Sequence, residues 1–132
     1  MVGDEIMIAV GIGCRRGATV ESIVEIVQQA LARVEQRVDV IELFSIDDKR
    51  EETGLLAAAA QLRLPLTFLS REALQSVEDR IVTPSQQAKS AFDVASVSEA
   101  ASLAGAGRDA VLVVPRIDGR GVTCAVAHGD GK

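Results

Sequence analysis

The chain has 132 residues, 48% of them hydrophobic and 25% charged, which is the balance of a folded domain rather than of a disordered segment. Its 14 basic and 19 acidic residues give a net charge of −5, whereas a general nucleic-acid-binding protein needs a basic surface to displace counterions. With no Trp or Tyr and only three Phe, the chain also lacks the aromatic side chains on which bases stack. We therefore predict one domain over residues 1–132, with no nucleic-acid partner.

The N-terminal and cysteine patterns predict a cytoplasmic protein. Asp4 and Glu5 precede the first apolar run where a signal peptide would carry basic residues, and no apolar run reaches the ~20 residues that cross a membrane. Cys14 and Cys124 suit a reducing compartment, although a disulfide between them stays open. Together with the single histidine, His128, they show no metal-ligand spacing, so we expect no metal site and no cofactor.

The first third of the chain is predicted to form a strand, a glycine-rich turn and a helix. The apolar run at residues 6–10 is too short for a buried helix and is followed at once by glycines, which favours a central strand. The predicted turn is GIGCRRG at residues 11–17. Apolar residues at helical spacing then predict a helix over about residues 20–35, with Thr19 as its N-cap.

The middle of the chain is predicted to add two strands and a helix. Branched and aromatic residues at 38–46 predict the second strand. A helix with a capping-box-like start is expected to begin at Asp47 or Asp48 and to end before Pro65. Residues 66–69 predict a short third strand.

A weakly patterned segment at residues 75–93 follows, and we predict that it is a mobile flap because it has few large apolar side chains. The Thr-Pro-Ser sequence at 83–85 fits a helix start within it, since proline tolerates the first helical position. Ser96 and Glu99 then have the spacing of a capping box and predict the start of another helix.

The last two predicted strands cover residues 110–115 and 122–128 and are joined by a tight turn at Asp118-Gly119, which makes them an antiparallel pair. Strands that alternate with helices predict an α/β fold. We expect a three-layer α/β/α sandwich with a mostly parallel sheet and a C-terminal antiparallel hairpin.

The GIGCRRG sequence combines several groups that bind anions. A turn between a strand and a helix presents backbone N–H groups and the positive end of the helix dipole. Gly11, Gly13 and Gly17 would let the backbone approach a ligand closely, and Arg15 and Arg16 add two positive charges. The alternatives are a turn that only needs positive φ and two solvated surface arginines.

Other candidate ligand-binding residues lie near the same edge of the predicted sheet. In open α/β sheets, ligands sit beyond the carboxyl ends of the strands, and Lys49 follows such an end. Thr83 and Ser85 would reach a ligand if the flap closed over it, although helix capping is the commoner use of such residues.

Cys14 lies inside the predicted turn and has two interpretations. A helix N-terminus and neighbouring arginines would lower the pKa of its thiol and make it a nucleophile. We favour the other interpretation, a small residue that packs under the turn. The glycine spacing has one residue too many for the G-x-G-x-x-G fingerprint of dinucleotide-binding proteins, yet a small nucleotide-binding domain stays open as an alternative.

Five stretches carry a family resemblance when taken together and in order. They are GIGCRRG at residues 11–17, KREETGLLAAA at 49–59, LRLPLTFLSREAL at 62–74, SVSEAASLAG at 96–105 and VTCAVA at 122–127. Over nearly its whole length the chain resembles the CobE/CbiG C-terminal-domain family of cobalamin biosynthesis. Thr53 and Arg116 depart from the proline and lysine that the family often has at these positions.

The resemblance implies an α/β domain that acts in the corrin-ring pathway. A related two-domain protein hydrolyses the ring-A lactone of cobalt-precorrin-5A and releases acetaldehyde, and this chain is similar only to its C-terminal domain. Stand-alone members look more like proteins that bind a corrinoid intermediate or hand it on, which implies other pathway enzymes as partners.

Three hypotheses about function follow. The first is a carrier or accessory protein that binds a precorrin or hydrogenobyrinic acid, whose rim of carboxylates suits the bidentate geometry of Arg15 and Arg16. The second is a hydrolase acting on the ring-A lactone, for which the candidate groups are Cys14, His128 and the carboxylates at 47–52. The third is a small nucleotide-binding regulatory domain that uses the same turn.

Overall fold

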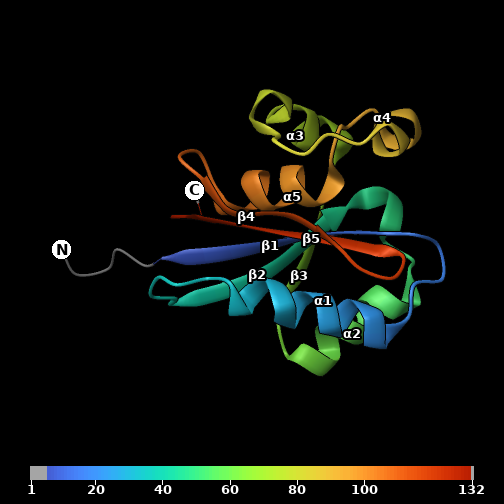
Figure 1. Cartoon of the computed structure of the whole chain (residues 1–132), viewed down its shortest axis with the longest axis horizontal. Coiled ribbons are helices and arrows are strands. Elements are labelled where there is room, and N and C mark those ends of the chain that lie inside the picture. The colour runs from blue at the N-terminus through green and yellow to red at the C-terminus, as the bar shows by residue number, and fades with distance from the viewer. Residues whose placement is uncertain (1–5, 132) are drawn as a thin grey trace.

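A five-stranded sheet with the strand order β3-β2-β1-β5-β4 forms the middle layer of the computed structural model, which describes residues 6–131 (Figure 1). β1, β2 and β3 are parallel, and β5 is antiparallel to both of its neighbours, β1 and β4. The predicted α/β class and the C-terminal antiparallel hairpin are confirmed. The strands are β1 (Met7–Cys14), β2 (Val40–Ile46), β3 (Leu66–Leu69), β4 (Val111–Asp118) and β5 (Val122–Gly129).

Helices cover both faces of the sheet. Figure 1 shows α1 and α2 on one face and α5 on the other, with α3 and α4 stacked beyond α5. Within residues 6–131, no helix is both long and apolar enough to cross a bilayer. The helices are α1 (Val20–Ala32), α2 (Thr53–Leu62), α3 (Arg71–Gln75), α4 (Gln86–Phe92) and α5 (Val97–Ala106), with short 3-10 turns at Asp47–Lys49 and Glu78–Arg80.

The helix α1 forms where the apolar periodicity predicts it. The predicted cap is confirmed, because the Thr19 side chain accepts a hydrogen bond from the Ser22 N–H at 3.1 Å. Its buried face includes Ile23 and Val27, which pack with Val10 of β1 in the larger apolar cluster of the protein. Each such fully buried side chain stabilises the fold by about 1.5–3 kcal/mol relative to an exposed one.

The helix α5 lies so close to β1 that no side chain fits between them at Gly11. A Cβ atom placed on Gly11 would collide with the backbone of Ser98 and Ser102. Gly105 meets the sheet in the same way, because a Cβ there would collide with the ring of Phe44 on β2. These glycines therefore serve the packing of helix on sheet.

Two predicted boundaries are wrong in ways that bear on the site. β1 continues to Cys14, so Gly11 and Gly13 lie in a strand and the turn contains only the last part of GIGCRRG. The helix expected from Asp47 or Asp48 begins at Thr53, and a 3-10 turn forms at Asp47–Lys49 instead. In the first case tertiary pairing outweighed the local signal, since β5 pairs with β1 as far as Cys14.

Candidate functional site

A cavity of about 520 Å³ opens at the edge of the sheet where β1 ends and β5 begins. It is bounded by the turn after β1, by the β4–β5 hairpin and by α4. Its lining includes six of the nine residues predicted to bind a ligand, from three separate parts of the chain. These six are Gly13, Cys14, Arg15, Arg16, Lys49 and Ser85.

The other three predicted residues do not line this cavity. Gly11 is buried under α5, as described above. Gly17 has a φ of 80° and ends the turn, and the backbone N–H of Thr83 donates to Glu99 at 3.0 Å. Thr83 therefore supports a wall of the cavity rather than contacting its interior.

The backbone cradle expected in the turn after β1 is already occupied by the protein itself. The Gly17 N–H donates to the Glu52 carboxylate at 2.9 Å, and the Arg15 N–H donates to the Gly121 carbonyl at 2.8 Å. Thr19 caps the helix that follows. Because these donors have partners, the positive charge available to a ligand comes from side chains: Arg15 and Arg16 are exposed, and Lys49 is half-buried.

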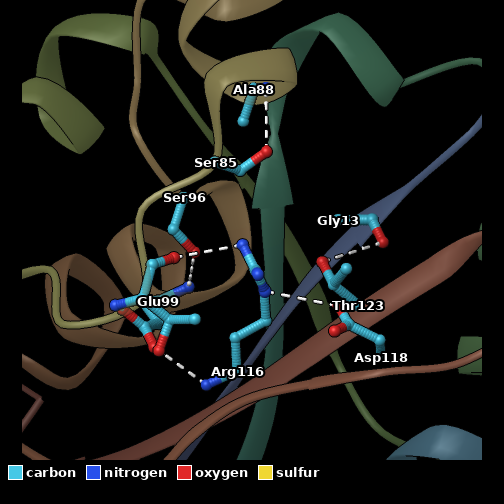
Figure 2. A network of polar contacts seen from close by, with 9 residues as sticks. Gly13, Ser85, Ala88, Ser96, Glu99, Arg116, Asp118 and Thr123 are labelled. Carbon is cyan, nitrogen blue, oxygen red and sulfur yellow. Dashed lines mark hydrogen bonds and ion pairs between the residues drawn. The ribbon is translucent and has the colours of Figure 1, made fainter.

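Arg116 of β4 also lines the cavity, and sequence reasoning missed it as a binding residue. Figure 2 shows its side chain between Glu99, Asp118 and the start of α4, at Ser85. The guanidinium Nη1 donates to the Thr83 carbonyl at 3.0 Å, and Nε lies 3.3 Å from a carboxylate oxygen of Asp118. The only sequence signal was that Arg116 departs from the lysine frequent in the resembling family.

Glu99 on α5 is a fully buried carboxylate that fixes this part of the site (Figure 2). Its N–H donates to the Ser96 hydroxyl at 3.3 Å, which is half of the predicted capping box. Its carboxylate instead accepts the N–H groups of Val82 and Thr83, at 2.9 and 3.0 Å, and of Arg116, at 2.8 Å. Burial raises the pKa of this carboxyl, but these N–H donors outweigh burial and hold it below its ordinary value.

The two cysteines are free thiols, so the disulfide left open by the sequence does not form. Burial raises the pKa of Cys14, and Glu52 adds to that effect while Lys49 opposes it, which argues against the activated nucleophile considered above. Cys124 is in the core, where burial raises its pKa to about 12. His128 pairs with Ile8 on β1, roughly 20 Å along the strand from Cys14, so the two cannot act together.

The acidic run at 47–52 is largely engaged in structural contacts. Asp47 pairs with Arg50, and Asp48 pairs with Arg71 at 2.6 Å. The Arg71 hydrogen bond lowers the pKa of Asp48 despite some burial, so this carboxyl is a poor proton acceptor at neutral pH. Glu52 is held by the Gly17 N–H. This arrangement supports a structural role for the run.

The helix α4 covers the cavity with its apolar side. Phe92 near its end lies under two cations, because Lys49 Nζ and the Arg71 guanidinium are each 5.7 Å from the ring centre. A second cavity of about 450 Å³ shares Arg16, Lys49, Ala91 and Phe92 with the first. The end of α4 therefore borders two adjoining hollows.

Comparison with known proteins identifies the family. The family described as "Cobalamin synthesis G C-terminus" matches residues 8–127, which is most of the chain. The chain belongs to this family. The predicted resemblance to CobE and the CbiG C-terminal domain is thereby confirmed, and the cavity lies in a cobalamin biosynthesis domain.

Individual members of the family support this assignment. The protein CobE of Sinorhizobium sp. is 32% identical over 121 residues, which are 91% of this chain and 79% of that protein. The crystal structure of a CobE from the cobalamin biosynthetic pathway superposes with a TM-score of 0.83 at 34% identity, covering 93% of this chain and 90% of the other. A cobalt-precorrin-5A hydrolase of Priestia megaterium is 29% identical over 92% of this chain, but the match spans only 32% of that longer protein.

Proposed function

We propose that this domain binds a carboxylate-rich corrin-ring intermediate, of the precorrin or hydrogenobyrinic acid type, as a carrier or accessory factor of cobalamin biosynthesis. The observation that carries the proposal is the set of cations gathered at one cavity: Arg15 and Arg16 from the turn after β1, and Lys49 from the 3-10 turn after β2. Charge-assisted hydrogen bonds from such groups are roughly twice as strong as neutral ones, and arginine offers two parallel bonds to a carboxylate.

The shape of the site also supports binding of a small molecule. Its volume of about 520 Å³ lies within the range of ligand pockets, and the residues at its floor are apolar, such as Val97 and Val122. A flat macrocycle needs such apolar surface under its ring and charged groups at its rim. We propose that α4 and the rest of the 75–93 flap close over the bound ring.

The test is an absorbance titration of the purified protein with hydrogenobyrinic acid. The Arg15→Ala/Arg16→Ala double variant is expected to weaken binding by about tenfold or more, because each lost charged hydrogen bond contributes about 1.5–3 kcal/mol. Arg33→Ala/Arg108→Ala is the matched control, since both arginines are exposed, lie outside the cavity and change the net charge equally. Absence of binding by the unchanged protein would overturn the proposal, and equal weakening in both variants would show that net charge alone acts.

Hydrolysis of the ring-A lactone of cobalt-precorrin-5A is a second candidate, favoured by the similarity to the Priestia hydrolase. The structure supports it less well, because burial raises the pKa of Cys14, and His128 of β5 pairs with Ile8, near the end of β1 opposite to Cys14. Release of acetaldehyde from cobalt-precorrin-5A by the purified protein would favour this candidate. Binding without acetaldehyde release would favour the carrier.

The nucleotide-binding alternative has lost its structural basis. It required a glycine-rich turn, whereas Gly11 and Gly13 lie in β1 and the Gly17 N–H is bonded to Glu52. A thermal-shift comparison of nucleotides with corrinoids tests it directly, since a ligand of the native state raises its stability.

A further inference from the structure

The strand β4 contains an irregularity at Arg116. Val114 pairs with Val126 and Ile117 pairs with Cys124. Between these two pairs β4 has one more residue than β5, which is a β-bulge. The extra length contains Pro115, which has no N–H and is tolerated because β4 is an edge strand. Bulges of this kind re-aim side chains and are common next to functional sites.

The bulge gives Arg116 a conformation that an ordinary strand residue would not have. Its backbone N–H donates to the buried carboxylate of Glu99 at 2.8 Å, a contact outside the sheet. Its side chain enters the cavity, where only 18% of it is exposed (Figure 2). Glu99 and the bulge together therefore hold the guanidinium at the wall of the cavity.

The guanidinium is incompletely paired in this position. It carries five N–H donors. Nη1 bonds to the Thr83 carbonyl, but among residues 6–131 no group accepts a hydrogen bond from the buried Nε. Asp118 lies 3.3 Å from Nε without hydrogen-bond geometry, and its side chain is 67% exposed. A buried charged donor without an acceptor is unfavourable, so the site is suited to an added anion.

Arg116 also lies apart from the other cations of the cavity. Arg15 follows β1, whereas Arg116 belongs to β4, and β5 runs between these two strands. Two strand spacings separate β1 from β4 by about 10 Å across the sheet, and Arg15 lies further along it, because Arg116 is level with Gly11. A ligand that contacts both must carry anionic groups that are well separated.

We propose that Arg116 is a second carboxylate-binding residue. The cavity then binds its ligand at two separated points, which are Arg15 and Arg16 on one side and Arg116 on the other. Asp118 lies beside the guanidinium and is displaced from it by a ligand carboxylate. This inference rests on the proposed function and specifies its ligand class: rigid, flat molecules with carboxylates on at least two edges.

The test is the same titration with hydrogenobyrinic acid on variants of the pair. Arg116→Gln is expected to weaken binding about tenfold, and Arg116→Lys to weaken it less, because lysine keeps the charge but loses the bidentate fork. Asp118→Asn is expected to tighten binding about threefold, since it removes the competing anion. In the Arg116→Gln background, Asp118→Asn is expected to give a smaller gain.

The outcomes separate this inference from the function on which it rests. If Arg15→Ala/Arg16→Ala weakens binding and Arg116→Gln does not, the second contact point is wrong while the proposed function stands. An undiminished gain from Asp118→Asn in the Arg116→Gln background would overturn the competition between the two residues. If Arg116→Gln fails to fold by circular dichroism, the exposed Asp118→Asn decides alone: tighter binding supports the inference, and unchanged or weaker binding overturns it.

Discussion

The helices α5 and α4 lie on the same side of the sheet, but they are held there in different ways (Figure 1). α5 has eight of its ten residues buried and packs so closely on β1 that Gly11 is required beneath it. α4 has no buried residue and is held by its ends and by the Phe92 contacts. The site therefore has a rigid floor and a cover that can open at small energetic cost, because few buried contacts would be lost.

Glu99 connects the floor to the cover. It belongs to the buried helix α5, yet its carboxylate binds the N–H groups of Val82 and Thr83, just before α4 begins. The start of the cover is thus anchored by buried hydrogen bonds, whereas α4 itself has no buried residue. The segment after α4 is also fixed, because Val94 is fully buried and the Ser85 N–H donates to the Ala95 carbonyl at 2.7 Å, so the exposed helix α4 lies between two anchored ends.

The strongest test of this contrast is removal of the Glu99 carboxylate. Glu99→Ala is expected to lower the free energy of unfolding by about 4 kcal/mol, because it leaves three N–H groups without their acceptor in a buried place. Urea denaturation measures this loss. Glu99→Gln keeps the shape and is expected to cost about half as much. A loss below about 1 kcal/mol for Glu99→Ala would show that the start of the cover is not anchored there.

The same carboxyl predicts how stability depends on pH. Because folding lowers the pKa of Glu99, its contribution is complete above the ordinary value of 4.5 and is lost as the pH falls through the lowered value. Glu99→Gln is expected to flatten this acid limb of the stability curve. An unchanged acid limb in the variant would assign the pH dependence to other carboxyls.

The next test concerns the floor and uses two glycines of the same sequence motif. Gly11→Ala is expected to destabilise the protein by about 3 kcal/mol, since the new Cβ would collide with the backbone of α5. Gly17→Ala, at a φ of 80° with open space around it, is expected to cost about 1 kcal/mol from backbone strain alone. Thermal unfolding of the two variants measures the difference, and the reverse order would contradict the packing role of Gly11.

The smallest effect on global stability is expected in the cover. Phe92→Ala removes two cation–π contacts, each of about 0.5–1 kcal/mol at such exposed sites. The free energy of unfolding is therefore expected to fall by about 2 kcal/mol at most. Amide hydrogen exchange in α4 is expected to accelerate several-fold while exchange in α5 stays unchanged. Equal acceleration in both helices would show that they open as one unit.

Local patterns in the sequence predict much of this fold but not the side-chain contacts of its site. Helical spacing and the Thr19 cap predict α1 because both depend on neighbours within a few residues. The spacing of Ser96 and Glu99 predicts the start of α5, but the partners of the Glu99 carboxylate lie up to 17 residues away on either side. The direction of the Arg116 side chain depends on the β-bulge between β4 and β5, which no local sequence pattern shows.

The glycines of GIGCRRG show the opposite failure, in which a local pattern is present but has another cause. Gly11 and Gly13 suggest a ligand-binding turn, whereas Gly11 makes room for α5 and Gly13 lies in a strand that pairs with β5. Arg15, Arg16 and Lys49 nevertheless line the cavity, because the ends of neighbouring parallel strands share one edge of the sheet.

The position of β5 between β1 and β4 has a consequence for how the protein is made. Cys14 pairs with Val122, so one wall of the cavity joins residues more than a hundred positions apart. A ribosome must synthesise β5 before this edge of β1 can be paired, and until then the strand presents open hydrogen-bonding groups. Such distant pairings close slowly, so the ligand site is expected to be among the last parts of the nascent chain to form.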